Sequence, residues 1–467
     1  MKFPEKHLDR TWIIFSLLLF FSLLLRLVRI QMGLWLDELF SLTEFLRGSW
    51  SELFTFYSSP NNHILYSILA KICINLFGEK EWSLRLPSVI MGTFTPPVFF
   101  LLFRKIFGAQ KALLASLMMI PSFWMVWFSQ DARGYAGMIL FSGLSQFLYL
   151  DFLQNPRKRT GFYYVLCSAL SSWFHLYALF IIAGQAFYGF FSFILNRQTH
   201  KPLIFILPAL ALTLGLTIYA MVFDQLFAYA LKGGKEIQDR WLGLYFWKDL
   251  IKMLSGTQFL MFALACLILF IIGLFRSVKL CPGLVILYLL PAGLIILTTF
   301  ILKIFIFSRF LAFLIPFFFI NISAGIEFIE LQARKLFPIM KQKIIYISVA
   351  VMVFIFLFSG LVRYYHLGKQ GFKDVSIYIK RRYPFRDVVS LGSAAYGYLY
   401  YDRYAQPLTG VEPIAPEELE GKLVVASHFW SISPENIHLL ARVCEQELYL
   451  SSAGAEDYGV VLYRCFK

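Results

Sequence analysis

The sequence predicts a polytopic α-helical membrane protein with about eleven spans, a long first outer loop and a small carboxyl-terminal α/β domain outside the cytoplasm. Hydrophobic residues make up 59% of the 467 residues and charged residues only 15%, and the mean hydropathy is +0.66. A soluble domain would contain about a quarter charged residues. Apolar runs of roughly 20 residues, enough to cross about 30 Å of hydrocarbon, alternate with short basic clusters. These observations exclude an ordinary soluble protein.

The net charge of +15 points to the membrane rather than to nucleic acid. Lysine and arginine residues occur in tight clusters between apolar runs, which is typical of cytoplasmic loops. The first apolar run, 12–30, follows Lys2, Lys6 and Arg10. It is longer than the apolar core of a signal peptide and lacks a small-residue cleavage site. We therefore expect an uncleaved first span, a cytoplasmic amino terminus and no nucleic-acid partner.

The second basic cluster decides how the chain continues. Arg104, Lys105 and Lys111 should also be cytoplasmic, yet two apolar stretches, 63–77 and 86–103, lie between the first span and this cluster. If both stretches crossed the membrane, the cluster would lie outside. The first is too short to cross, so we expect a helix on the outer membrane interface there. This makes 31–85 one long outer loop.

The remaining basic clusters keep the same alternation and give eleven spans. We predict them at 12–30, 86–103, 112–128, 135–153, two short helices within 161–196, 203–222, 256–275, 284–301, 310–327 and 344–362. We thus expect a membrane domain over 1–362 and an extracytoplasmic α/β domain over 363–467, where the charge becomes ordinary and apolar runs become short. In that domain Cys444 and Cys465 can form a disulfide, although nothing in the sequence requires it.

Unusual polar residues gather at the predicted outer ends of the spans. Ionisable groups cost about 2.5–3.5 kcal/mol each at mid-bilayer and less near the interface, so they often mark function. Cations at such a surface can hold a lipid-borne phosphate, and a carboxylate can accept a proton from a hydroxyl group. The candidates are Asp37, Glu38, Asn61, Asn62, His63, Gln130, Asp131, Arg133, His175, Tyr177, Lys303 and Arg309.

Taken one at a time, these residues also have ordinary explanations. Asp37 and Glu38 can form a solvated loop edge, and His63 can lie among lipid headgroups. Asp131 and Arg133 can form a local ion pair at a helix start. His175 can be a hydrogen-bonded residue of a tight hairpin, and Arg309 an interfacial anchor.

Five segments, in the same order along the chain, resemble the bacterial family-39-like glycosyltransferases. These are membrane enzymes of the GT-C superfamily, related to protein O-mannosyltransferases and to the aminoarabinose transferase of lipid A. The matching segments are WLDELFS (35–41), NHILY (62–66), EWSLRLPS (81–88), FSQDARGY (128–135) and SRFL (308–311) followed by Pro316. Three departures affect the substrate pocket: the prolines after His63 are absent, serine precedes Arg309, and Asp131 stands where glutamate is more usual.

The resemblance implies a GT-C-type fold and a sugar donor linked to polyprenyl phosphate. It implies Asp37 as the general base, with Glu38 and Asp131 shaping the same catalytic pocket. Together with the positions of the polar residues, it gives these candidates for substrate binding: His63, Tyr66, Gln130, Arg133, His175, Tyr177, Lys303 and Arg309. Transfer would be direct and would invert the anomeric centre. We expect no metal ligands and no required cofactor, with a divalent cation as the alternative.

The same resemblance implies a multi-pass protein of the inner (plasma) membrane, surrounded by membrane lipids. The acceptor is left open among a lipid, a glycan and a protein. The alternative hypothesis is a lipid or sugar transporter, or a non-catalytic protein of envelope assembly, although the sequence shows no inverted repeat. A third hypothesis is that the outer domain binds glycan and regulates the membrane domain.

Overall fold

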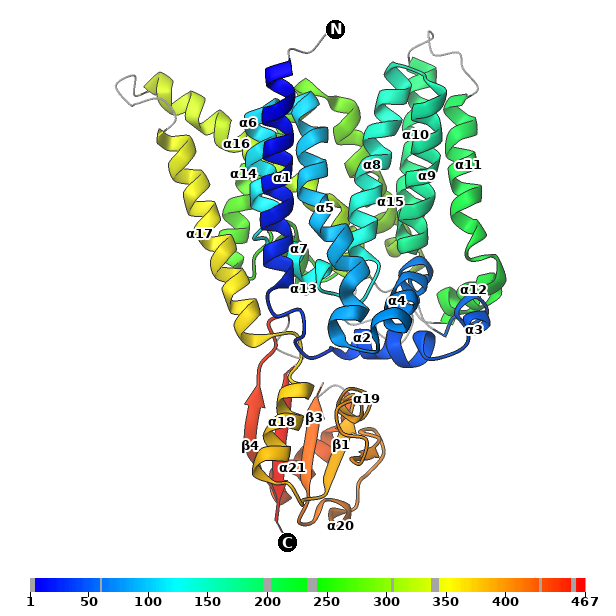
Figure 1. The fold of residues 1–467 in the computed structure, drawn as a ribbon, viewed down its shortest axis with the longest axis vertical. Helices are drawn as coiled ribbons and strands as arrows, with labels where there is room; N and C mark the ends of the chain where they lie inside the picture. Colours follow the sequence, from blue (N-terminus) through cyan, green and yellow to red (C-terminus); the bar gives the residue numbers. More distant parts are fainter. Residues whose placement is uncertain are drawn as a thin grey trace. The chain divides into compact units, whose positions relative to one another are not determined.

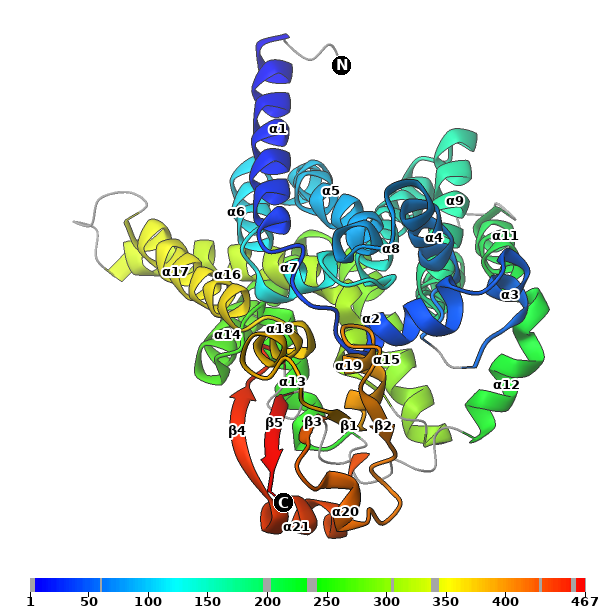
Figure 2. The same ribbon diagram turned by 60° about the horizontal axis from the view of Figure 1, so that its bottom comes forward.

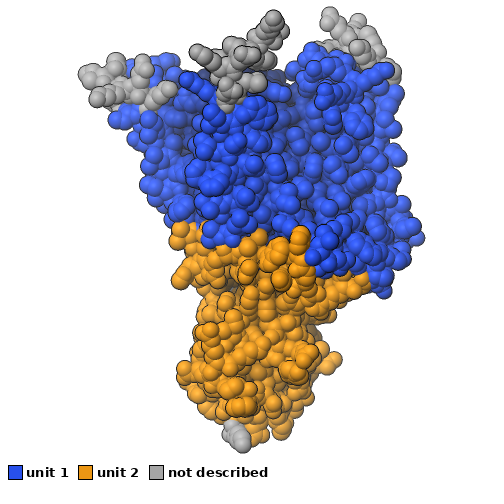
Figure 3. All heavy atoms as spheres, in the orientation of Figure 1, with its two compact units in different colours: residues 1–28, 49–76, 85–361 blue, residues 29–48, 77–84, 362–467 orange. Residues whose placement is uncertain are grey.

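The protein is described here by a computed structural model that covers residues 5–58, 61–195, 203–232, 242–303, 306–336, 344–427, 431–454 and 459–466. The chain is mostly helical, with one small sheet (Figure 1). It divides into two compact units, which Figure 3 shows in different colours. The first unit comprises residues 1–28, 49–76 and 85–361, and the second comprises 29–48, 77–84 and 362–467.

Long apolar helices form most of the first unit and lie side by side (Figures 1 and 2). They are α1 (Glu5–Leu27), α5 (Glu81–Phe107), α8 (Tyr135–Gln154), α9 (Lys158–Phe174), α10 (Leu179–Leu195), α11 (Leu203–Thr217), α14 (Leu260–Leu280), α15 (Pro282–Leu302), α16 (Ile315–Leu336) and α17 (Ile344–Leu367). The shorter helices are α3 (Trp50–Thr55), α4 (Ile64–Phe77), α6 (Ala109–Met119), α7 (Phe123–Ser129), η2 (Leu176–Ala178), η3 (Ala220–Val222), α12 (Phe223–Lys232), α13 (Leu244–Ser255) and η5 (Ser308–Leu314).

Each of the eleven predicted spans coincides with a helix or a bent helix pair. Among the described residues, eight helical segments are long and apolar enough to cross a membrane, and two bent pairs raise this number to ten. The eleventh predicted span is α9, whose 17 residues extend about 25 Å. The protein is therefore an integral membrane protein, and the predicted polytopic helical class is confirmed.

A proline causes the sharper bend of the two bent helix pairs. Helices α6 and α7 meet at 64°, and Pro121 lies in the break between them. Proline disfavours helical geometry in the residue before it and cannot donate the next helical hydrogen bond. The Ser122 hydroxyl then begins α7 by accepting a hydrogen bond from the Met125 amide at 3.5 Å. The bend leads directly to the buried segment 129–133, which belongs to the candidate site.

Three short elements, α3, α4 and α12, pack together at one end of the bundle (Figures 1 and 2). Their shared apolar core contains Leu53, Tyr57 and Ile64 together with Tyr219 and Val222. Helix α4 has 14 residues, so it is too short to cross the hydrocarbon, as predicted for 63–77. Its position on the membrane interface stays a prediction.

The second unit contains a five-stranded sheet in the order β2-β1-β3-β5-β4. The strands are β1 (Val388–Gly392), β2 (Gln406–Leu408), β3 (Leu423–Ser427), β4 (Cys444–Leu450) and β5 (Val460–Cys465), and the helices are α18 (Phe372–Arg382), α19 (Ala394–Leu399), α20 (Pro416–Leu419) and α21 (Pro434–Val443). Strand β1 pairs in parallel with β2 and β3, while β5 pairs antiparallel with β3 and β4. All five residues of β3 are buried, as expected for a central strand. The predicted small α/β domain is confirmed.

Two segments of the predicted outer loop belong to the same compact unit as this sheet. Residues 29–48 carry α2 (Leu36–Ser41) and the π-helix η1 (Leu42–Leu46), and residues 77–84 form the second segment. Across the sheet, a disulfide joins Cys444 of β4 to Cys465 of β5, which are paired residues in the ladder. The disulfide that the sequence allowed is thus present.

Candidate functional site

Arg133 and His63 form the centre of a buried polar cluster in the first unit. Both residues are at most 4% exposed. Arg133 donates through Nε to His63 Nε2 at 3.2 Å and through Nη2 to Asn61 Oδ1 at 2.6 Å. Because His63 Nε2 accepts this bond, Nδ1 carries the proton and donates to the Phe174 carbonyl at 3.1 Å. These bonds fix the orientation of both side chains.

Close backbone packing explains why the motif segments converge here. A Cβ atom on Gly134 would lie 1.8 Å from the Phe174 carbonyl oxygen and 3.2 Å from the His63 Cβ, so only glycine fits. The Ser88 hydroxyl donates to the Arg133 carbonyl at 2.8 Å. The structure therefore brings together three of the predicted motif segments, which lie far apart in the sequence.

His175 lies beside His63 and provides a buried donor. The two imidazole rings are 4.8 Å apart between centroids. His175 Nδ1 accepts a hydrogen bond from the Tyr177 amide at 3.3 Å, so Nε2 carries the proton. Within the described ranges, this Nε2 atom is buried and has no hydrogen-bond partner. A buried donor without a partner is uncommon in a folded protein and requires an explanation.

Both histidines are electrically neutral in this environment. Burial is the main cause that holds the pKa of His63 well below its usual value, and the charge of Arg133 acts in the same direction. Burial likewise lowers the pKa of His175, with further lowering by Arg133 and Arg309. The site therefore combines arginine cations with neutral imidazoles, which is a suitable environment for an anion.

Arg309 and its neighbours form the second cationic part of the cluster. Its guanidinium carbon lies 4.1 Å from the centroid of the Phe307 ring. The adjacent Ser308 hydroxyl donates to the carboxylate of Asp249, which lies on α13. Burial raises the pKa of Asp249, and the Ser308 hydrogen bond and the Arg309 charge oppose this effect. Asp249 was not predicted, because in the sequence it looks like an ordinary acid of a polar outer loop.

Aromatic rings connect the two arginine regions. Phe310 lies 4.2 Å from Tyr177 and 5.5 Å from His175 between ring centroids. Tyr135 lies 4.9 Å from His175, and the Arg133 guanidinium is 5.2 Å from the centroid of the Tyr135 ring. The predicted residues His63, Arg133, His175, Tyr177 and Arg309 are thus brought into one cluster.

Other predicted residues of this unit have different surroundings. Gln130 is fully buried, and its amide donates to the carbonyls of Arg26 and Val28 at 2.7 and 2.8 Å, which holds the end of α1. Asp131 and Tyr66 are also buried. Lys303 is exposed at the end of α15. In the part of the chain that the structure describes, no hydrogen bond or ion pair joins Lys303 to the cluster. The functional roles of these four residues stay predictions.

The predicted acidic pair lies in the second unit, in the first turn of α2. Asp37 is partly exposed, whereas Glu38 is fully buried. Glu38 accepts a hydrogen bond from the Trp35 amide at 3.2 Å and forms a 3.5 Å ion pair with Lys369, which is also fully buried. The two neighbouring acids therefore have different environments. Lys369 was not predicted, because a lysine just after a span is usually an interfacial anchor.

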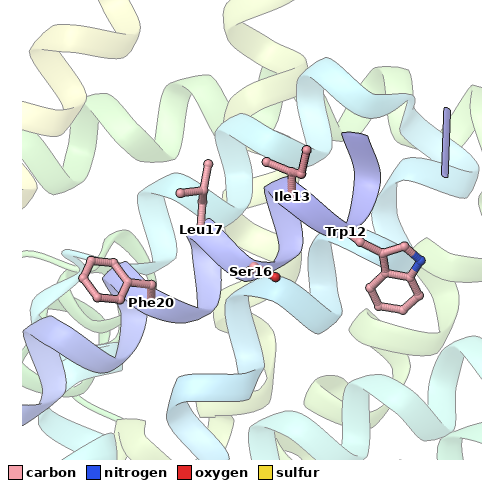
Figure 4. A pocket seen from close by; sticks show the side chains of 5 residues that line it. All are labelled: Trp12, Ile13, Ser16, Leu17 and Phe20. Carbon is pink, nitrogen blue, oxygen red and sulfur yellow. The ribbon is translucent and has the colours of Figure 1, made fainter. Parts of the chain in front are cut away.

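The depression shown in Figure 4 does not belong to either polar region. It is lined by Trp12, Ile13, Ser16, Leu17 and Phe20, all from α1 (Figure 4). Most of the apolar window of this helix is exposed in the protein. A shallow surface of this composition fits lipid tails, because it provides one hydroxyl group and no charge. We therefore assign it to the bilayer-facing surface.

The described residues include no group of three or more histidine, cysteine, aspartate or glutamate side chains that could hold a metal ion. This observation describes only the side chains that could bind a metal ion. The metal requirement of the reaction stays a prediction.

The arrangement of helices is the GT-C fold of membrane glycosyltransferases. ArnT from Cupriavidus metallidurans in the apo state superposes with a TM-score of 0.56 at 12% identity, covering 98% of this chain and 98% of that chain. The same protein bound to undecaprenyl phosphate gives 0.53 at 13% identity, covering 99% and 98%. An oligosaccharyltransferase from Archaeoglobus fulgidus gives 0.55 at 11% identity, covering 95% of this chain and 72% of that chain.

At the level of sequence, residues 60–223 match the family model described as dolichyl-phosphate-mannose-protein mannosyltransferase. No curated protein is similar enough in sequence to match the chain. The matched region contains the motif segments around His63, Ser88 and Arg133. The resemblance to this glycosyltransferase family and the GT-C-type fold are therefore confirmed.

Proposed function

We propose that the protein is an inverting glycosyltransferase that moves a sugar from a polyprenyl-phosphate donor to an acceptor hydroxyl group at the outer face of the membrane. The proposal agrees with the family match over 60–223 and with the fold shared with ArnT, which has been seen with undecaprenyl phosphate bound. The observation that carries it is the unpartnered Nε2–H donor of His175, buried in a cluster that contains two arginines.

This cluster suits the anionic phosphate of the donor better than a neutral ligand. Arg133 and Arg309 supply fixed positive charge, and neutral His175 supplies a hydrogen-bond donor without a further desolvated charge. Asn61 and His63 hold Arg133 in place before any ligand arrives. Preorganised donors of this kind stabilise negative charge that develops on a leaving group. We assign the donor phosphate to Arg133, His175 and Arg309.

The proposed chemical step is a direct displacement at the anomeric carbon. The Asp37 carboxylate accepts the proton of the acceptor hydroxyl, and the hydroxyl oxygen forms the new bond to the anomeric carbon. The bond from that carbon to the phosphate oxygen breaks, and polyprenyl phosphate leaves with the electron pair. Attack from the face opposite the leaving group inverts the configuration.

We assign the second unit to the non-cytoplasmic side. The Cys444–Cys465 disulfide fits an oxidising compartment, since disulfides rarely persist in the cytosol. The basic start at Lys2, Lys6 and Arg10 then places the amino terminus in the cytoplasm, as expected for an odd number of spans. The proposed location is the inner (plasma) membrane.

We further propose that the reaction needs no metal ion, because the arginines already supply the positive charge that a divalent cation would provide. Chelation with EDTA should then leave the transfer rate unchanged. A loss of activity that Mg²⁺ or Mn²⁺ restores would instead support the metal-dependent alternative.

The function is tested with purified protein in proteoliposomes that contain a labelled polyprenyl-phosphate sugar and a mixture of envelope lipids and glycans. We expect transfer by the wild type and a loss of about a thousandfold in Asp37→Asn, because general-base catalysis contributes about 10²- to 10⁴-fold. Asp224→Asn, in α12, is the matched control and should retain activity. Full activity of Asp37→Asn would remove Asp37 as the base. Failure to transfer any such sugar would contradict the proposed function.

A further inference from the structure

The segment that carries Asp37 is anchored at several points by residues 365–401 of the same unit. Lys373 Nζ donates to the Gln31 carbonyl at 2.9 Å, and the Tyr401 hydroxyl accepts from the Leu34 amide at 2.7 Å. Arg29 donates to the backbone carbonyl of His366 at 3.1 Å. In an isolated loop, the Gln31 carbonyl and the Leu34 amide would form hydrogen bonds with water instead. Here they are fixed by the carboxyl-terminal domain.

The two residues that flank Asp37 are held most firmly. Gln370 Oε1 accepts a hydrogen bond from the Leu36 amide at 2.7 Å, and Lys369 pairs with Glu38 at 3.5 Å. The side chains of Glu38 and Lys369 are both fully buried, so neither charge is replaced easily by water. Consecutive residues 369 and 370 thus hold the residues on either side of Asp37.

Two further contacts make this arrangement rigid. The second carboxylate oxygen of Glu38 accepts from the Trp35 amide at 3.2 Å, and Lys369 Nζ lies 5.7 Å from the centroid of the Trp35 ring. Trp35 is 4% exposed. The ion pair therefore fixes the start of α2 as well as the side chain of Glu38.

Gln370 also connects the segment that carries Asp37 to the sheet. Its Nε2 donates to Ser427 Oγ at 3.3 Å, and this hydroxyl donates to the Gly459 carbonyl at 2.9 Å. Ser427 is the last residue of β3, and Gly459 precedes β5. A continuous chain of hydrogen bonds thus connects the amide next to Asp37 with two strands of the sheet.

We propose that Lys369 and Gln370 are positioning residues for the Asp37 carboxylate, and that anchoring this segment is the role of the carboxyl-terminal domain in catalysis. The inference rests on the proposed function, in which Asp37 is the base. It also assigns Glu38 a positioning role as the partner of Lys369, in place of the catalytic role predicted from the sequence. A base held by rigid surroundings maintains the geometry that proton transfer requires.

The test compares Lys369→Met, Lys369→Arg and Gln370→Met with the wild type in the proteoliposome assay. We expect Lys369→Met to lower kcat at least tenfold, while binding of labelled polyprenyl phosphate changes less than twofold. Lys369→Arg should recover part of kcat because it retains the positive charge. Gln370→Met, which leaves both charges in place, should lower kcat about threefold to tenfold. Lys422→Met is a matched control, since the side chain of this lysine donates to Gln406 near the surface, and its kcat should stay at the wild-type value.

The double variant Glu38→Gln/Lys369→Met separates two reasons why Lys369→Met could lower kcat. One is that Asp37 is no longer positioned, and the other is that the buried charge of Glu38 has lost its partner. The double variant removes both buried charges, so it should fold at least as well as Lys369→Met, yet its kcat should stay below that of the wild type. Wild-type kcat in both Lys369→Met and Gln370→Met, alongside an inactive Asp37→Asn, would overturn the positioning role and leave the proposed function intact. If Lys369→Met does not fold, Gln370→Met decides: an unchanged kcat in that variant also overturns the inference.

Discussion

The two polar regions of this protein differ in how completely their buried groups are satisfied. Around Asp37, the buried side chains of Glu38, Lys369 and Gln370 all have partners within their own unit. Around Arg133, the buried Nε2–H of His175 has no hydrogen-bond partner among the residues that the structure describes. A satisfied network stabilises one geometry, whereas an unsatisfied donor has a free-energy cost that a ligand can remove. The comparison supports the two proposals, in which the first region positions a reactive group and the second binds a ligand.

After the loss expected for Asp37→Asn, the largest expected effect concerns Arg309 in the cluster around Arg133. Arg309→Ala should lower transfer by about a hundredfold to a thousandfold, the range found when one preorganised donor to a developing anion is removed. Arg309→Lys should recover part of this loss, because the charge remains but the planar fork does not. Measuring kcat and the affinity for labelled polyprenyl phosphate separates binding from catalysis. Equal activity of Arg309→Ala and the wild type would show that this region does not hold the phosphate.

A change at the disulfide of the sheet, away from both polar regions, should affect stability instead of chemistry. Replacing both Cys444 and Cys465 with alanine should destabilise the sheet by about 2–4 kcal/mol, because the disulfide closes a loop between residues 21 positions apart. Activity per folded molecule should be retained. Proteolysis of the second unit under increasing urea measures the effect, and Cys73→Ala, at a free cysteine, is the control. No change in urea sensitivity would contradict this prediction.

A smaller effect is expected from the unsatisfied donor itself. His175→Phe keeps the aromatic packing against Tyr135 and Phe310 but removes Nε2–H, so the affinity for polyprenyl phosphate should fall about tenfold, or about 1.4 kcal/mol. Removing the unpartnered Nε2–H favours the folded state, whereas the Tyr177 amide loses its Nδ1 acceptor, so the stability should change by no more than about 1 kcal/mol. Tighter binding of polyprenyl phosphate by this variant would contradict the assignment. Thermal unfolding with and without the lipid measures both quantities.

The last expected effect is a dependence of stability on pH. The pKa values of His63 and His175 are lowered in the folded state, so the unfolded chain binds more protons once the pH falls below about 6.5. Stability should therefore be complete above this pH and should decrease below it, by up to about 1.4 kcal/mol per pH unit for each histidine. Thermal unfolding between pH 5 and 8 tests this sign. His175→Phe should make stability less dependent on pH. If the stability of the wild type instead rose as the pH fell, the two histidines would not both be neutral in the folded state.

Much of the fold follows from the distribution of apolar and basic residues. The eleven predicted spans coincide with helices or bent pairs, because a run of roughly 20 apolar residues has few stable alternatives in a bilayer. The shortness of α4 was also predicted from its composition. The bend after Met119 was not predicted, although Pro121 is visible in the sequence, because the apolar run continues through it.

The candidate site was predicted in part. The predicted residues His63, Arg133, His175 and Arg309 lie together in one cluster, and their functional roles stay predictions. Asp249, Lys369 and Gln370 were missed, since each occupies a segment without a motif. Their contacts join residues as far apart as 334 positions, and no local pattern reports such a pairing.

The sequence by itself determined that this chain is a membrane protein, where its long apolar helices lie, and which superfamily of glycosyltransferases it resembles. These properties depend on hydrophobicity and on short motifs, which are local. Only the tertiary structure decided that Glu38 is buried against Lys369 while Asp37 stays partly exposed, and that His175 keeps a donor without a partner in the described chain. The physical reason is that burial and hydrogen bonding depend on neighbours from distant segments, which the chain acquires only when it is folded.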